Sequence, residues 1–500
     1  MQTITETPRS LAVSFDNSYA HLPERFYARL DPTPAARPRL IKFNAALAAE
    51  LGLDVSGVSA DTLAQLFSGN LRLKGAEPLA MAYAGHQFGH FVPKLGDGRA
   101  ILLGEVRDGA GVRRDIQLKG SGRTPYSRDG DGRAALGPVL REYVVSEAMH
   151  ALGVPTTRAL AIVATGESVY RDRKLPGAIL TRVAASHVRV GTFQFFSARG
   201  DVEAIKQLAD FVIDRHYPEI KEAEAPYLAL FRAVAERQAR LIACWMHVGF
   251  IHGVMNTDNT AISGETIDFG PCAFMDAYDP AAVFSSIDTA GRYAYANQPH
   301  IAQWNLARFA ETLLPLLNPI LERAIELANE ALSAFWPRFE QHWLSGMRRK
   351  LGLFTAEDGD TQLVRGLLEV MHRQQADFTL TFRQLCDASG GQQFDAAVRA
   401  LFADAAVYDE WATTWRSRLA RESLPASVRA ESMSHANPAF IPRNHRLEQA
   451  IEAAVEHEDF TLFADLLRVL ARPYEDQEGF EAFATAPRAS ERVLQTFCGT

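Results

Sequence analysis

Residues 252–270 of this chain read HGVMNTDNTAISGETIDFG. The stretch places two adjacent polar residues, Asp258 and Asn259, shortly before the triplet DFG at 268–270. Carboxylate and carboxamide oxygens are ligands that Mg²⁺ and Mn²⁺ prefer, and these ions accompany nucleotide phosphates. The stretch therefore supplies side-chain oxygens of the kind that a divalent metal ion binds.

The spacing within this stretch is that of the catalytic loop of protein kinases, with one residue changed. In the kinase frame HRDxxxxN the first and eighth positions are His252 and Asn259, and the DFG triplet follows. The third position, which carries the catalytic aspartate in kinases, is Val254. Because valine cannot accept a proton, the pattern indicates a protein that holds metal and ATP without ordinary kinase chemistry.

The composition is that of a globular protein with an acidic excess. Of its 500 residues, 47% are hydrophobic and 22% are charged, and the formal net charge is −8. Nucleic-acid-binding proteins normally carry a basic excess, so we expect no nucleic-acid partner. Residues 241–257 contain no Asp, Glu, Lys or Arg, but this stretch is shorter than a membrane span, so we expect no membrane partner.

The cysteines and the N-terminus predict a reducing compartment. Four cysteines, at positions 244, 272, 386 and 498, form no CxxC pair, which supports neither a zinc site nor a secreted disulfide framework. The first 26 residues lack a basic start followed by an apolar run. We therefore expect no signal peptide and a cytoplasmic location.

A strand-rich pattern begins near residue 90. We predict a hairpin from residues 91–95 and 99–106 around the turn GDG at 96–98, because Asp-Gly pairs favour tight turns. A second pair of strands is predicted to flank a turn at Thr165-Gly166 and to end with residues 178–183.

Between these strands lie a lysine and a glutamate at the positions that a kinase would use. In the strand 115–119 the apolar residues alternate, so Gln117 and Lys119 share the face opposite the core. Residues 138–152 follow as a helix that ends at Gly153, and Glu142 lies on it. In kinases such a lysine contacts phosphate oxygens and such a glutamate orients it through an ion pair.

The order of these elements predicts an α+β chain with a protein-kinase-like two-lobed fold, in which a small strand-rich N-lobe precedes a larger helical C-lobe. Helical periodicity dominates beyond residue 300, which predicts a helical extension at the C-terminal end, and a helix expected at 43–51 after a Pro-rich segment predicts an extension at the N-terminal end. The predicted divisions are an N-terminal extension at 1–80, the N-lobe at 81–190, the C-lobe at 191–330, and a C-terminal extension with a redox-candidate tail at 331–500.

Each of these features taken singly has a commoner structural interpretation. A bare GDG is usually only a turn, and a lone strand lysine is usually a solvated charge. His86 and His90 are spaced to share a helix face as metal ligands, but the glycines around them and the missing third ligand favour a structural role. Function is favoured by the ordered combination of Lys119, Glu142, Asn259 and Asp268.

Several long segments resemble the selenoprotein O family of protein adenylyltransferases, once considered pseudokinases. The chain ends in FCGT, with Cys498 at the position where some relatives carry selenocysteine, which is typical of bacterial members. The resemblance covers nearly the whole chain and rests on YAGHQFGHF, KLGDGRAILLGE, DIQLKGSGRTPYSRDGDGRA, GVMNTDN, IDFGPCAFMD, GRYAYANQP and NPAFIPRNHRLEQAI.

The resemblance implies transfer of AMP from ATP to a Ser, Thr or Tyr hydroxyl of another protein, with release of pyrophosphate. The γ-phosphate would lie inside the cleft and the α-phosphate would face the acceptor. Asp258 is implied as the catalytic residue, and Asn259 and Asp268 as ligands of Mg²⁺ or Mn²⁺. The implied ATP contacts are Gly96, Gly98, Arg99, Lys119, Asp131, Gly132, Arg182, Arg189 and Asp268.

The residue chemistry agrees with this implication. Lys119, Arg182 and Arg189 supply more positive charge than the single kinase lysine, which suits a terminal phosphate that is held and not transferred. Asp258 directly precedes Asn259, so it can act as a general base or orient a metal ligand, and the sequence leaves both roles open.

Two other functions compete with adenylyl transfer. The first is an atypical kinase that transfers the γ-phosphate with an unorthodox base, which Val254 disfavours. The second is an inactive ATP-binding scaffold, which Asp258, Asn259 and Asp268 disfavour because a scaffold does not need metal ligands.

The resemblance also implies redox control, because activity in this family is linked to redox state. Cys272 lies two residues after the DFG glycine, and Cys498 lies close to the end of the chain. We hypothesise a disulfide between them under oxidising conditions. Two unpaired thiols in a reducing cytosol are the alternative.

Overall fold

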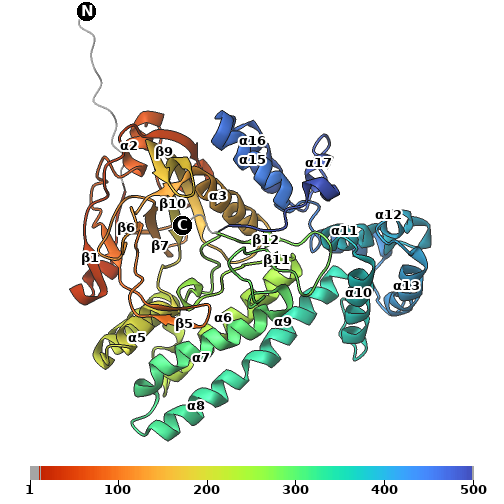
Figure 1. Cartoon of the computed structure of the whole chain (residues 1–500). Helices are drawn as coiled ribbons and strands as arrows, with labels where there is room; N and C mark the ends of the chain where they lie inside the picture. Colours follow the sequence, from red (N-terminus) through yellow and green to blue (C-terminus); the bar gives the residue numbers. More distant parts are fainter. Residues whose placement is uncertain (1–10, 12, 498–500) are drawn as a thin grey trace, which may run out of the picture.

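The structure is a computed structural model that describes residue 11 and residues 13–497. Within these residues, an antiparallel sheet of eight strands lies beside a larger helical part (Figure 1). Its strand order is β1-β3-β6-β7-β10-β9-β2, with β8 paired to β10. The mixed helix and strand content predicted from the sequence is confirmed.

The sheet is built from eight segments, of which β1 and β2 form its two edges and both come from the first 80 residues. Two small hairpins, β4 with β5 and β11 with β12, lie outside it. The strands are β1 Tyr27–Arg29, β2 Arg39–Phe43, β3 Leu79–Met81, β4 Gly85–Gln87, β5 His90–Val92, β6 Ala100–Arg107, β7 Arg113–Lys119, β8 Ala134–Ala135, β9 Arg158–Tyr170, β10 Lys174–Ala184, β11 Phe250–Ile251 and β12 Ala273–Phe274.

Side-chain alternation gives the sheet two apolar faces. Val163 and Ile179 are opposite each other on β9 and β10 and pack with the short helices α1 (Ala45–Glu50) and α2 (Ala60–Phe67). The neighbouring pair, Ile162 and Leu180, points the other way and packs with α3 (Leu136–Ala151). The sheet is therefore covered on both faces.

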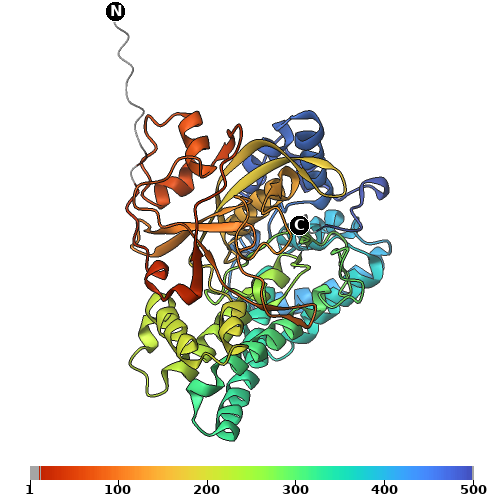
Figure 2. The same ribbon diagram turned by 60° about the vertical axis from the view of Figure 1, so that its left-hand side comes forward.

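The helical part surrounds one long helix, α6, which packs against α7 and α9. Figure 1 shows α10 to α13 on the side away from the sheet, whereas α15 and α16 return to contact α3 (Figure 2). The helices are α4 Val190–Ser197, α5 Val202–His216, α6 Pro226–His247, α7 Gln298–Leu317, α8 Leu321–Ser333, α9 Phe335–Lys350, α10 Asp360–Gln374, α11 Phe378–Ala388, α12 Ala396–Arg399, α13 Ala405–Leu419, α14 Ala426–Ser434, α15 Asn444–His457, α16 Thr461–Leu470 and α17 Glu481–Ala484.

The two ends of α6 determine how the chain leads into residues 252–270. Pro226 occupies the first turn, where its missing N–H costs nothing. After the helix, Gly249 has a φ of 70°, a conformation that glycine adopts without strain, and the chain turns into β11 and then residues 252–270. Over residues 13–497 no helix combines the length and the apolar character needed to cross a membrane.

The predicted hairpin across residues 91–106 is wrong. β5 pairs with β4, and β6 pairs with β3 and β7. The physical reason is Asp97, which is buried and accepts hydrogen bonds from Met81 N at 3.0 Å and Gln117 Nε2 at 3.2 Å. These contacts draw the GDG segment into the sheet, so that it does not reverse the chain at the surface.

The predicted turn at Thr165-Gly166 is also wrong, because β9 continues through it to Tyr170. Gly166 has a φ of 72°, and a Cβ there would lie 2.6 Å from the Cβ of Arg37. The glycine therefore makes room for the chain that approaches β2, and the reversal comes later, at residues 171–173. By contrast, the predicted strand at 115–119 and the helix at 138–152 are confirmed as parts of β7 and α3.

Candidate active site

A buried ion pair joins the sheet to α3. Lys119 is the last residue of β7, and its side chain lies on the face opposite Ile116 and Leu118. Lys119 Nζ is 2.6 Å from Glu142 Oε2, and Glu142 is only 4% exposed. The pair therefore fixes the direction of the ammonium group.

Two arginines from β10 and the loop after it converge on the same place. Arg182 Nε lies 2.8 Å from Glu142 Oε1, and Arg182 Nη2 lies 2.6 Å from Asp268 Oδ1. Lys119 Nζ is also 2.6 Å from that oxygen of Asp268. Arg189 Nη1 lies 3.5 Å from the other oxygen, Oδ2. Three cations therefore surround one carboxylate, and we call these five residues the phosphate-clamp cluster.

Electrostatics keep the two carboxyl groups of the cluster ionised despite burial. Burial raises the pKa of Asp268, but Arg182, Lys119 and Arg189 outweigh it and hold this pKa well below its usual range. Burial also opposes ionisation of Glu142, yet Arg182 and Lys119 keep its pKa below the usual value. Arg189 also lies near the buried carboxyl groups of Asp97 and Asp258, so the three cations are shared among four acidic groups.

Asp268 adopts a backbone conformation that is unusual for its residue type. Its φ is 64°, in the left-handed region that glycine prefers. Such a conformation costs on the order of 1 kcal/mol or more and persists where the surrounding contacts stabilise it. Here those contacts are the ion pairs to the three cations.

Asp258 lies in a short 3₁₀ turn, Thr257–Asn259, close to the cluster. Its carboxylate is buried: Oδ2 accepts a hydrogen bond from Gln87 Nε2 at 3.3 Å, and Oδ1 has no hydrogen-bond partner among the described residues. Burial raises the pKa of Asp258 to about 6, although the nearby Arg189 acts to lower it. The Arg189 guanidinium also donates to the Asp258 carbonyl oxygen at 2.9 Å.

The β4–β5 hairpin covers this turn. His86 N donates to Thr257 Oγ1 at 2.7 Å, and Phe88 N donates to Asn256 Oδ1 at 3.0 Å. At Gly85, a Cβ would lie 2.6 Å from Asp258 Oδ1, so only glycine allows this approach. The hairpin therefore determines where the Asp258 carboxylate lies.

Helix α7 supports residues 252–259, which we call the catalytic loop after the kinase segment of the same spacing. Asn305 Nδ2 donates to Met255 O at 2.9 Å, and Gln298 Oε1 accepts a hydrogen bond from His252 N at 3.0 Å. The ring of His252 reaches the next segment, since its Nε2 lies 2.9 Å from Ile267 O. The loop and the DFG segment are thus held at a fixed separation.

Asn259 directs its amide nitrogen into the loop. Its Nδ2 donates to Val254 O at 2.9 Å, which leaves the amide oxygen as the group available to a cation. Within the described residues, no group of three or more His, Cys, Asp or Glu side chains is arranged to hold a metal ion. A metal ion here would therefore have fewer than three such side chains as ligands and would take its remaining oxygens from Asn259 or from a bound ligand.

The GDG segment reaches the cluster through Tyr83. The N–H of Gly96 donates to Tyr83 O at 3.0 Å, and the Tyr83 ring lies 4.6 Å from the guanidinium carbon of Arg189. Arg99 O accepts from Gly120 N at 2.7 Å, directly after Lys119. A Cβ at Gly98 would lie 2.9 Å from Tyr126 O, so the segment packs closely.

Asp131 and Gly132 lie in the loop between β7 and β8. The structure pairs the Asp131 carboxylate with Arg171 at 2.9 Å, at the β9–β10 turn, and the described contacts of Asp131 do not include the cluster. Gly132 closes the loop, because its carbonyl oxygen accepts from Gly122 N at 3.0 Å.

The segment after the DFG triplet contacts the last described residues of the chain. Thr496 Oγ1 donates to Pro271 O at 2.5 Å, and Thr496 N donates to Phe284 O at 2.7 Å. Cys272 is a free thiol, and burial raises its pKa to about 12. Cys498 lies outside the described residues.

Sequence reasoning missed Tyr83, Gln87 and Asp97, which link the hairpin and the GDG segment to the cluster. All three lie in the segments YAGHQFGHF and KLGDGRAILLGE. A single polar residue beside glycines shows no periodicity, so its hydrogen-bond partner in a distant element cannot be predicted from the sequence. His86 and His90 lie on paired strands and not on a helix, and His86 Nδ1 is 2.8 Å from Gln194 Nε2.

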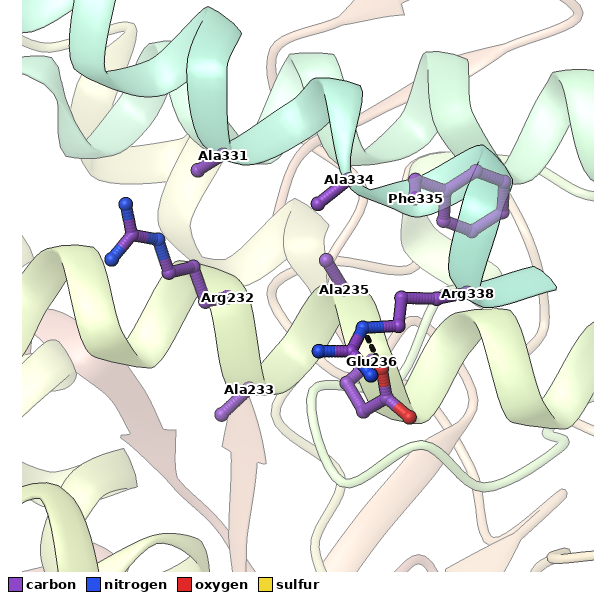
Figure 3. Close-up of a pocket in the computed structure, with 8 residues that line it drawn as sticks. All are labelled: Arg232, Ala233, Ala235, Glu236, Ala331, Ala334, Phe335 and Arg338. Carbon is purple, nitrogen blue, oxygen red and sulfur yellow. Dashed lines mark ion pairs between the residues drawn. The ribbon is translucent and has the colours of Figure 1, made fainter. Parts of the chain in front are cut away.

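A separate hollow of about 570 Å³ lies between α6 and the α8–α9 junction (Figure 3). Its charged side chains are already paired, as in the contacts of Glu236 with Arg338 at 3.5 Å and with His342 at 2.7 Å. None of its lining residues belongs to the phosphate-clamp cluster. The hollow therefore adds no group to the cluster or to the catalytic loop.

Comparison with known proteins matches residues 9–471 to the family described as protein adenylyltransferase SelO. A relative named protein nucleotidyltransferase YdiU, from Rhizobium meliloti (strain 1021), is 66% identical over 98% of this chain and 100% of its own length. Proteins of the same name from Rhizobium leguminosarum bv. trifolii and Bradyrhizobium sp. strain BTAi1 are 64% and 63% identical, over 100% and 97% of this chain and 99% of each relative.

Proposed function

The chain belongs to the protein adenylyltransferase SelO family, and from that premise we propose that it transfers AMP from ATP to Ser, Thr or Tyr hydroxyl groups of proteins and releases pyrophosphate. The observation that carries the proposal is the phosphate-clamp cluster. Three cations converge on the Asp268 carboxylate, so phosphate oxygens that displace it would meet three charged hydrogen-bond donors.

We propose that the architecture is protein-kinase-like, with an N-lobe at 81–190 and a C-lobe at 191–330, flanked by extensions at 1–80 and 331–500. The Lys119–Glu142 pair between a strand and a helix supports this interpretation. So does the position of the catalytic loop between β11 and β12, which are paired. In kinases these two features assemble the nucleotide cleft.

In this proposal Lys119, Arg182 and Arg189 hold the β- and γ-phosphates inside the cleft. The two arginines present planar groups that can each contact a phosphate through two N–H donors. Phosphate oxygens would replace Asp268 as partners of these cations, so binding exchanges one anion for another. The remaining proposed ATP contacts are Gly96, Gly98, Arg99, Asp131 and Gly132.

The residues fit a divalent metal ion. Asn259 has its amide oxygen available, and the Asp268 carboxylate stays ionised, so together they supply the oxygen ligands that Mg²⁺ or Mn²⁺ prefers. When bound, such an ion neutralises phosphate charge. We propose these two residues as its protein ligands.

Asp258 is proposed as the general base. Its Oδ1 accepts no hydrogen bond from any described residue. A pKa of about 6 leaves the carboxylate mostly ionised at pH 7 yet basic enough to accept a proton. The proton of the acceptor hydroxyl would move to this carboxylate as the oxygen attacks the α-phosphorus. Val254, at the usual position of a kinase base, cannot replace it.

The test is incubation of the protein with ATP labelled at either the α- or the γ-phosphate, together with protein substrates. We expect label from the α-phosphate in protein and none from the γ-phosphate. Transfer of the γ-label alone would show a kinase. Absence of both labels, with ATP binding retained, would show an inactive scaffold.

We also propose a regulatory disulfide between Cys272 and Cys498. The contacts of Thr496 with Pro271 and Phe284 support it, because they bring the chain near position 498 to the segment of Cys272. Each thiol would lose one proton and one electron to an oxidant such as oxidised glutathione. Because Cys272 is buried with a raised pKa, we expect slow formation. Non-reducing peptide mapping after oxidation is the test, and two free thiols would refute it.

Free thiols are expected in a reducing environment, and Cys244, Cys272 and Cys386 are all unpaired among the described cysteines. We therefore propose a cytoplasmic location.

A further inference from the structure

A cationic patch lies beside the catalytic loop and has no role in the chemistry proposed above. It comprises His86, Phe91, Arg292, Trp304 and Arg308, and we call it the Trp304 patch. The guanidinium carbons of Arg292 and Arg308 lie 4.7 and 5.1 Å from the centre of the Trp304 ring. The ring of His86 lies 5.3 Å from Trp304, and that of Phe91 lies 5.0 Å from His86.

The charge of Arg292 is not compensated. Across residues 13–497, no carboxylate lies within ion-pair distance of its guanidinium, and its Nε is buried without a hydrogen-bond partner. The Nε of Arg308 is likewise buried without a partner, but the Nη2 of Arg308 pairs with Glu311 at 2.6 Å, so only Arg308 of the two has a carboxylate partner among the described residues. An unmatched buried donor costs stability, and the guanidinium of Arg292 has charge that a carboxylate from outside the chain would neutralise.

The patch adjoins the catalytic loop through the β4–β5 hairpin. A Cβ at Gly89, in the hairpin turn, would lie 3.8 Å from the Arg292 guanidinium carbon. Two residues earlier, Gln87 contacts the Asp258 carboxylate. On the other side, Tyr293, next to Arg292, donates its hydroxyl to Asn256 Oδ1 at 2.7 Å. A protein segment on the patch would therefore lie close to Asp258.

We propose that the Trp304 patch binds an acidic segment of the acceptor protein beside its acceptor hydroxyl, with Arg292 contacting an Asp or Glu carboxylate. Stacking on Trp304 holds the guanidinium plane and leaves its edge N–H groups for a carboxylate. Phe91, which is 39% exposed, adds an apolar contact at the rim.

The charge of the whole chain supports this choice of partner. The net charge of −8 disfavours acidic segments over the chain as a whole, so a local cation without a carboxylate partner gives the patch a preference for them. The inference deepens the proposed function, since it assigns a substrate class to the same site.

The test uses three peptides with one central tyrosine flanked on both sides by Glu, by Gln or by Lys. AMP transfer from α-labelled ATP gives kcat and KM for each peptide. We expect the lowest KM for the Glu peptide, and we expect Arg292→Gln to raise that KM about 5-fold, as the loss of one partly exposed charge contact would. The KM for the Gln peptide and the affinity for ATP should stay unchanged.

Two variants sharpen the test. Arg292→Glu should invert the preference, so that the Lys peptide has the lowest KM. The matched control is Arg323→Gln on α8, where an arginine that pairs with Glu326 at 2.8 Å is removed away from the patch. It should leave all three KM values unchanged. Melting temperatures and ATP affinities of all variants show that they are folded.

Equal KM values for the three peptides with the unaltered protein would overturn the inference and leave the proposed function standing. So would an Arg292→Gln variant whose ATP affinity falls while its peptide KM values stay the same. An unaltered protein that transfers no AMP to any peptide or to itself would overturn both proposals.

Discussion

Replacing Asp258 by asparagine should abolish adenylyl transfer and at the same time stabilise the protein without nucleotide. The carboxylate is buried, and its Oδ1 has no partner among the described residues. Its pKa rises from the ordinary 3.8 to about 6, which corresponds to about 3 kcal/mol of unfavourable free energy when the group is ionised. Asparagine has a similar shape and no charge, so it removes this penalty.

The sign of the pH dependence follows from linkage. The folded pKa lies above the unfolded one, so the folded state binds the proton more tightly and the native protein loses stability as pH rises from about 4 to above 6. The advantage of Asp258→Asn should therefore be near zero below pH 4, about half of its full value at pH 5, and about 3 kcal/mol at pH 7 and above.

The assay is thermal unfolding of both proteins across this pH range, with AMP transfer from α-labelled ATP measured in parallel. We expect transfer to fall by about 10²- to 10⁴-fold, as for loss of a general base. The control is Asp16→Asn, because hydrogen bonding to Arg113 lowers the pKa of Asp16 and its loss should destabilise the protein at neutral pH. A stability difference independent of pH, or full activity in Asp258→Asn, would refute the reasoning.

Three further substitutions test individual contacts of the site. Gln87→Leu removes a hydrogen bond that lowers the pKa of Asp258, so the rise of kcat with pH should move above pH 6. An unchanged pH profile of kcat would show that Gln87 does not influence the ionisation of Asp258. Asp268→Asn should abolish transfer at every Mg²⁺ or Mn²⁺ concentration, because it removes an ionised ligand, and activity restored by excess metal would argue for weaker binding only. Lys119→Met should raise KM for ATP while the melting temperature without nucleotide changes little, since Arg182 still neutralises Glu142. A large loss of melting temperature would instead show that Lys119 is mainly structural.

Predictions from the sequence were confirmed where they rested on the strand or helix periodicity of consecutive residues. Alternation along residues 115–119 predicts which face carries Lys119, and the structure shows that face toward Glu142. The apolar stripe at 138–152 similarly predicts α3. Both features depend on the local backbone geometry, which the spacing of apolar residues within a short window indicates.

Predictions from the sequence were wrong where a tertiary contact outweighs the turn-forming composition of a short segment. The GDG segment has the composition of a hairpin turn, but the buried Asp97 bonds to Met81 and Gln117, which belong to two other strands. Gly166 has the composition of a turn as well, yet it serves the close approach of Arg37. Neither partner can be inferred from neighbours in sequence, because each lies well outside the local window.

The shared partners within the phosphate-clamp cluster imply that its members act as a unit. Lys119 and Arg182 contact the same oxygen of Asp268, and both also contact Glu142. When either cation is removed, the other continues to neutralise both carboxylates, so single substitutions understate what the pair contributes. In the proposed function phosphate would replace Asp268, and Glu142 would still hold both cations, so the cluster would need little rearrangement to bind a nucleotide. The mutual pairing also offsets the cost of placing these charges in a buried site, where an unpaired ion would be costly.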